Sequence, residues 1–160
     1  MIQRIQTIFL ILVIALMAAF LALPIWGKMD TDSGEVYEIK ALALVHIPSE
    51  GAEPILRYTP FAIVGGVAVL IILVTLFSIF KYKNRVLQMQ LGMVNSILIL
   101  VVLGLLMWEI FTGQNEWLPL VAGSFGAGLF MPAVAMVFNR MAIRSIKKDE
   151  DLVRSVDRIR

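Results

Sequence analysis

Four long runs of apolar residues dominate the pattern along the chain. They cover residues 8–26, 61–80, 91–111 and 118–138, and Glu109 is the only charged residue within them. Each run is close to the roughly 20 residues that a helix needs to cross a membrane. Lipid offers backbone N–H and C=O groups no partners, so each run must be helical. The pattern predicts an all-α membrane protein, a four-transmembrane-helix bundle.

The first run has a second interpretation, because Arg4 precedes it in the way that a basic residue precedes a signal-peptide core. The run exceeds the roughly 7–15 residues usual for such a core, and no convincing Ala-x-Ala cleavage site follows. Pro24 and Trp26 are instead typical of a helix end at the membrane interface. We therefore expect a retained transmembrane helix.

Lys and Arg are distributed unevenly between the segments outside the runs. Eleven lie at the N-terminus, in the loop after the second run and in the tail, and three lie elsewhere. An excess of Lys and Arg marks cytoplasmic segments. We therefore expect a multi-pass protein of the bacterial inner (cytoplasmic) membrane with both termini cytoplasmic. Topology and headgroup contact are assigned to Arg4, Lys81, Lys83 and Arg85, with the lipid bilayer as partner.

The loop at 27–60 is the largest segment predicted outside the cytoplasm. Residues 35–47 alternate in polarity as a strand does, 48–51 suit a turn, and 55–58 suit a short return strand. The pattern predicts a small extracytoplasmic β-hairpin-like loop. An isolated hairpin is marginally stable in water, so this one must rest on the helix ends or on a partner.

Small residues recur at four-residue spacing in the fourth run. The pairs are Gly123 with Ala127 and Ser124 with Gly128. This spacing on a helix favours close helix packing in membranes, and Asn95 in the third run is expected to form an interhelical hydrogen bond. Pro132 is expected to kink the fourth helix, either as a static feature or as a transporter hinge.

The chain becomes charged after residue 138, which divides it into a transmembrane domain (1–138) and a cytoplasmic tail (139–160). Asp149 suits the N-cap of a final amphipathic helix. Its partner-binding residues are expected to be Leu152, Arg154, Val156, Arg158 and Ile159. This helix could dock onto its own bundle, a second copy in a homo-oligomer, or another membrane protein.

The sequence offers little chemistry. It has no cysteine and a single histidine, His46, so we expect no catalytic residues, no cofactor and no metal. Nucleic-acid binding requires a basic stripe on a folded domain, and we expect none here. Glu109 and Glu116 flank the last outer loop and are interpreted as solvated interfacial charges.

Three segments resemble an uncharacterised family of small four-span inner-membrane proteins from Bacteroidota, a domain of unknown function. They are the opening Met1-Ile2-Gln3-Arg4-Ile5-Gln6-Thr7, the turn Lys83-Asn84-Arg85-Val86-Leu87-Gln88 and the ending Lys148-Asp149-Glu150-Asp151-Leu152-Val153-Arg154-Ser155-Val156-Asp157-Arg158-Ile159-Arg160. The resemblance covers essentially the whole chain and implies the same four-span topology. It implies no activity.

Three functions are compatible with these features. The first is a non-enzymatic accessory or scaffold protein whose tail docks a partner or its own bundle. The alternative is a small transporter or channel for an uncharged or lipid-like solute, motivated by the glycines of the fourth run and Pro132. The third, a membrane enzyme, would require His46, Glu109 and Glu116 to converge.

Overall fold

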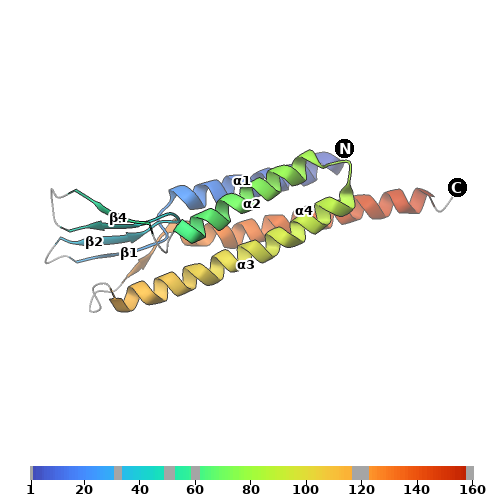
Figure 1. Ribbon diagram of the computed structural model, residues 1–160. Coiled ribbons are helices and arrows are strands. Elements are labelled where there is room, and N and C mark those ends of the chain that lie inside the picture. Colours follow the sequence, from blue (N-terminus) through green and yellow to red (C-terminus); the bar gives the residue numbers. More distant parts are fainter. Residues whose placement is uncertain (1, 31–33, 49–52, 59–61, 117–122, 158–160) are drawn as a thin grey trace.

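The computed structural model describes residues 2–30, 34–48, 53–58, 62–116 and 123–157 (Figure 1). Its long helices are α1 (Ile2–Ala22), α2 (Ala62–Phe80), α3 (Arg85–Glu116) and α4 (Phe130–Asp157). All four are long and apolar enough to cross a membrane, so the predicted number of membrane-capable helices is confirmed. The first helix ends at Ala22 rather than at Trp26, because Trp26 belongs to a strand.

The helices form a bundle in which each packs against two others. α1 and α3 both contact α4, and α2 contacts α1 and α3 on the other side. The core between them is apolar, with fully buried Val13, Met17, Ile71, Ile99 and Val102 among its members. Many large apolar side chains face outward, including Ile8, Leu73, Ile97 and Leu100, as expected where the surrounding solvent is lipid.

A small antiparallel sheet lies at one end of the bundle, which we call the sheet end (Figure 1). Its strands are β1 (Trp26–Met29), β2 (Val36–Ile39), β3 (Leu44–Ile47), β4 (Ile55–Arg57) and β5 (Ser124–Phe125), in the order β4-β3-β2-β1-β5. The predicted return strand corresponds to β4. The sheet is larger than the hairpin expected, since β1 begins at the last residue of the first apolar run and β5 lies within the fourth.

The prediction of one strand across residues 35–47 is wrong. The chain turns back at 40–43, where the Lys40 N–H donates to the Ala43 carbonyl at 2.9 Å. Ile39 and Leu44 therefore face each other across β2 and β3, and both are buried. The turn packs against α2 at Gly65, where a Cβ atom would lie 2.7 Å from the Ala41 carbonyl oxygen. The alternating polarity did not reveal this turn because small Ala residues occupy it.

The predicted helical packing of the small residues in the fourth run is also wrong. Ser124 lies in β5, Ala127 and Gly128 lie in the 3₁₀ helix η1 (Ala127–Leu129), and Gly123 precedes both. A Cβ at Gly123 would collide with the Trp26 ring, and one at Gly128 would lie 2.7 Å from the Pro24 carbonyl oxygen. These small residues therefore allow close approach to the α1–β1 connection rather than to another helix.

Pro132 does not kink α4. It is the third residue of the helix, in the first turn, where a backbone N–H has no intrahelical acceptor. Proline is therefore tolerated there without a lost hydrogen bond. The fourth helix begins at Phe130, twelve residues later than the apolar run predicts, and the part of that run at 118–122 lies outside the described residues.

Polar side chains join the helices in the half of the bundle nearer the 81–84 turn. The Asn95 Nδ2 atom of α3 donates to the Thr75 Oγ1 atom of α2 at 2.8 Å, and both residues are fully buried. On the other side of α3, the Asn139 Nδ2 atom of α4 donates to the Gly92 carbonyl at 2.9 Å and the Ser96 hydroxyl at 3.0 Å. These bonds fix the register of α3 against α2 and α4 where apolar burial gives no drive to associate.

Candidate functional site

Arg85 begins α3 at the end of the bundle opposite the sheet, beside the 81–84 turn; we call this the turn end. Asn84 caps the helix, since its Oδ1 atom accepts from the Leu87 N–H at 3.0 Å and its carbonyl accepts from the Gln88 N–H at 3.1 Å. Asparagine at an N-cap satisfies backbone donors that lack helical partners. The cap therefore fixes the direction in which Arg85 leaves α3.

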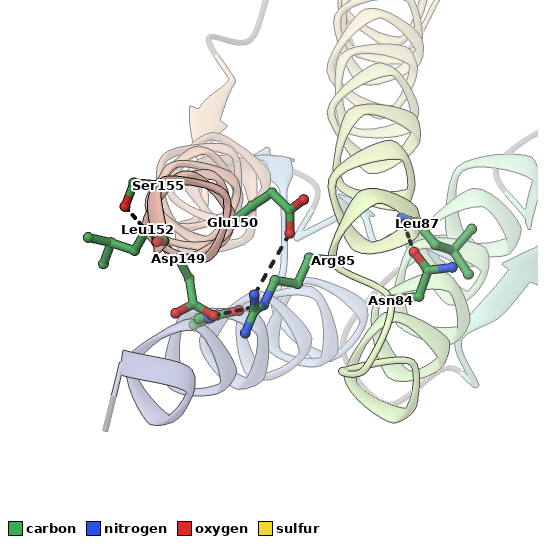
Figure 2. Close-up of polar contacts among 8 residues, drawn as sticks. Asn84, Arg85, Leu87, Asp149, Glu150, Leu152 and Ser155 are labelled. Atoms are coloured by element: carbon green, nitrogen blue, oxygen red, sulfur yellow. Dashed lines mark hydrogen bonds and ion pairs between the residues drawn. The ribbon is translucent and has the colours of Figure 1, made fainter. Parts of the chain in front are cut away.

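The Arg85 guanidinium reaches α4 (Figure 2). Its Nε lies 2.9 Å from the Asp149 Oδ2 atom, and its Nη1 lies 3.8 Å from the Glu150 Oε2 atom. The Gln6 Nε2 atom of α1 donates to the same Asp149 oxygen at 3.4 Å. Asp149 is thus contacted by side chains from two other helices. We call Gln6, Arg85, Asp149 and Glu150 the turn-end clamp.

Three members of the turn-end clamp, Gln6, Arg85 and Asp149, line a cavity of about 520 Å³. Its lining residues are Gln6, Thr7, Ile8, Ile79, Tyr82, Arg85, Gln88 and Asp149. Gln88 is buried, and its Nε2 atom donates to the Ser78 carbonyl at 2.8 Å, which closes the last turn of α2 against α3. The cavity combines polar groups with apolar Ile8 and Ile79, so it could accept a small amphipathic group.

Each of the three segments that resemble the uncharacterised family contributes to this end of the bundle. Gln6 and Thr7 come from the opening, Arg85 and Gln88 from the turn, and Asp149 from the ending. From the sequence, Arg85 is expected at the lipid headgroups and Asp149 at a helix N-cap. The pairing of the two was missed, because a single sequence gives no signal for contacts between distant residues.

The tail is not a separate helix. α4 continues without a break from Phe130 to Asp157, so Asp149 lies inside the helix and caps nothing. No proline or glycine interrupts residues 139–157, so the helix begun in the apolar run simply propagates. Beyond the turn-end clamp, Leu152 is 47% exposed and Val153 is 41% exposed.

The other predicted partner-binding residues are only partly described. Arg154 and Val156 lie in α4, but their side chains are outside the described set, and Arg158 and Ile159 lie outside the described residues. Of the predicted topology residues, Lys81 is exposed with its Nζ 5.5 Å from the centre of the Phe77 ring, and Lys83 is exposed. Arg4 lies in α1, and its side chain is not described.

The groups considered for enzyme chemistry lie near the sheet end. Glu109 is 6% exposed and its Oε2 atom has no hydrogen-bond partner among the described residues, so its interpretation as a solvated charge is wrong. His46 of β3 stacks on Tyr37 of β2, with ring centres 4.1 Å apart. The side chain of Glu116 is not described. In the described part of the chain, no group of three or more His, Asp or Glu could hold a metal ion.

Two titratable groups of the sheet have shifted pKa values. Burial raises the pKa of Tyr37 above its usual 10.0, and the neighbouring charge of Glu35 adds to the increase. Burial lowers the pKa of Lys28, whose Nζ lies 5.4 Å from the centre of the Trp26 ring. Although Lys28 lies in the polar loop at 27–60, it is only 2% exposed.

Comparison with known proteins gives one informative result. No curated protein matches the chain. A family model described as a domain of unknown function (DUF4293) matches residues 2–159, a range that includes the bundle, the sheet and the turn-end clamp. Because this match covers nearly all of the 160 residues, the chain belongs to the DUF4293 family.

Proposed function

We propose that this protein is a non-enzymatic accessory or scaffold protein of the bacterial inner membrane, with its termini in the cytoplasm. In this proposal the last turns of α4 dock a partner protein. The observation that carries the proposal is the turn-end clamp: Arg85 and Gln6 hold α4 at Asp149, while Leu152 and Val153 just beyond remain exposed. The uneven Lys and Arg distribution supports the cytoplasmic placement of this end.

The clamp holds α4 at Asp149, and the helix continues beyond it. Eight residues follow Asp149 within the helix, which corresponds to about 12 Å of helix. Figure 1 shows α4 extending past the start of α1 and the turn between α2 and α3. We call residues 150–157 the α4 arm. A helix already ordered before binding loses less conformational entropy on association than a disordered tail does.

The chemistry of the α4 arm indicates the class of partner. Leu152 and Val153 present apolar surface next to the exposed acidic residue Asp151. Short helices of this kind bind in apolar grooves of other proteins. We therefore propose a protein with an apolar groove and a basic residue at its rim, which would complement Asp151.

Co-purification tests the proposal. The full-length protein would be tagged at its N-terminus, extracted mildly from its own membrane and compared with Leu152→Asp. Leu56→Asp is the matched control, because Leu56 of β4 is 49% exposed at the sheet end. The wild type and Leu56→Asp should retain a stoichiometric partner that Leu152→Asp loses. Equal recovery of that partner with Leu152→Asp would contradict the proposal.

Glu109 favours a second candidate function, a small transporter. Carboxylates buried within membrane helices often mark ion or proton pathways. Glu109 has 6% of its surface exposed inside a helix segment able to span the membrane. Pro132 and the glycines of the fourth run do not support a transporter, since Pro132 makes no hinge and those glycines do not pack against another helix. Proton flux into proteoliposomes that Glu109→Gln abolishes would support transport, and flux equal to that of empty liposomes would contradict it.

A further inference from the structure

The face of α4 opposite the bundle carries a row of basic side chains. We call Arg140, Arg144, Lys147 and Lys148 the α4 cation row; all four are exposed. Their spacing of i, i+4, i+7 and i+8 places them on one side of the helix. Ala142, Ile146 and Asp149 lie on the other side, toward the bundle. The expectation that the protein has no basic stripe is therefore wrong.

These cations are not neutralised within the part of the chain that the structure describes. None of the ion pairs Lys40–Glu38, Arg85–Asp149 and Arg85–Glu150 involves a member of the α4 cation row. An open hollow of about 410 Å³ lies along the row, lined by Arg144, Lys147, Lys148, Asp151, Leu152 and Ser155. Four positive charges beside a hollow whose lining includes one carboxylate, Asp151, favour an anionic ligand.

The position of the row along the bundle indicates where that ligand comes from. Arg140 follows Asn139, which hydrogen-bonds to Gly92 of α3. Gly92 lies seven residues into α3 from Arg85, or about 10 Å along the helix axis. On the same side of α4, the preceding Val134 and Val137 are 40% and 57% exposed. The row thus starts on the apolar, lipid-facing surface and runs toward the turn end, a path that a soluble polyanion or nucleic acid could not follow.

We infer that the α4 cation row binds the phosphate of an anionic phospholipid, whose acyl chains lie along Val134 and Val137. Arg140 and Arg144 can extend their guanidinium groups toward the headgroup layer while their methylene stems stay in apolar surroundings. A guanidinium group matches two phosphate oxygens at once, which an ammonium group cannot do. Lys147 and Lys148 then add charge at the turn end of the row. The proposed ligand is one bound lipid, centred on Arg140 and Arg144, although the hollow at the turn end of the row shares Asp151 and Leu152 with the α4 arm.

Native mass spectrometry can count this lipid. The full-length protein would be placed in detergent micelles containing equal amounts of phosphatidylglycerol and phosphatidylcholine, and compared with Arg140→Gln/Arg144→Gln. The control Lys40→Gln/Arg57→Gln removes the same charge at the sheet end. We expect the wild type and the control to retain phosphatidylglycerol selectively. The fraction of the α4 variant that carries bound phosphatidylglycerol should be at least five-fold lower than that of the wild type.

Two results would overturn the inference. One is equal phosphatidylglycerol binding by Arg140→Gln/Arg144→Gln and the wild type. The other is complete displacement of the lipid by millimolar inorganic phosphate, which would show a site for free phosphate rather than for a bilayer lipid. All four residues are exposed, so the variant should keep the wild-type melting temperature in phosphatidylcholine alone. If it does not, Lys147→Gln/Lys148→Gln provides the second test, with the same direction expected.

Discussion

Arg85 and Asp149 join the start of α3 to the last part of α4, with 2.9 Å between the guanidinium Nε and the carboxylate Oδ2. Their side chains are 21% and 13% exposed, and Asp149 also accepts from Gln6. The contact is therefore a partly buried, charge-assisted hydrogen bond that links three helices. It holds the α4 arm in one direction relative to the bundle.

A double-mutant cycle on Arg85→Gln and Asp149→Asn should give a coupling of about 1 kcal/mol in the free energy of unfolding. The estimate lies between the values for exposed ion pairs and for buried charge-assisted bonds. Lys40 and Glu38 provide the control, because their 3.2 Å pair is more exposed, and its coupling should be near zero. Unfolding would be followed in detergent micelles. Equal coupling in the two cycles would show that the clamp adds no stability.

The bond between Asn95 and Thr75 predicts a second effect on stability. Thr75→Val removes the acceptor of the buried amide and should lower the free energy of unfolding by about 0.6–1.7 kcal/mol, the range for hydrogen bonds between membrane helices. Thr112→Val is the matched control, since the Thr112 hydroxyl donates only to the Trp108 carbonyl of its own helix. A loss no larger for Thr75→Val than for Thr112→Val would contradict the role of this bond.

Gly126 should not tolerate a side chain. A Cβ atom there would collide with the carbonyl oxygen of Pro24, a backbone group that cannot rotate away. Gly126→Ala should therefore destabilise the protein by about 1–3 kcal/mol, as overpacking does. Gly104→Ala should be neutral or stabilising, because a Cβ at Gly104 meets nothing within 4 Å and alanine favours the helix. The melting temperatures of the two variants test this contrast.

Tyr37 should make stability fall at alkaline pH. Its pKa is raised in the folded protein by burial and by Glu35, so the folded state holds the phenolic proton more tightly than the unfolded chain does. Stability is then complete below the unfolded pKa of about 10 and declines as the pH rises beyond it. Tyr37→Phe keeps the ring that stacks on His46 but removes the proton. The melting temperature of this variant should fall less between pH 9 and 11, and an unchanged decline would exclude Tyr37 as its cause.

Hydropathy was enough to predict the four membrane-capable helices, because length and apolarity alone determine that property. It failed at the fourth run, where residues 123–129 carry no charge but form β5 and η1 rather than a transmembrane helix. A signal for the true start was present: Pro132 suits a first helical turn, and the glycines before it disfavour a helix. The sheet was underestimated because β1 and β5 are short and their pairing is non-local.

The candidate site was harder to predict than the fold. Arg85, Asp149 and Gln6 each belong to a conspicuous segment, but nothing in one sequence states that these segments meet. Glu109 was misplaced for a related reason: its position near a helix end suggests exposure, whereas its helical face turns it inward. The spacing of the four basic residues in the α4 cation row can be read from the sequence. The position of the row along the bundle cannot, because it depends on the Asn139–Gly92 bond.

Photo-crosslinking from position 152 in intact cells tests the central claim most directly. A photoreactive residue would replace Leu152 on the α4 arm, and in a separate chain Leu56 at the sheet end. The account predicts that position 152 crosslinks to one discrete protein whose sequence differs from that of this chain. Position 56 should give no crosslink to that protein. Products from position 152 that contain only a second copy of this chain, or none at all, would contradict a partner-docking role for the α4 arm.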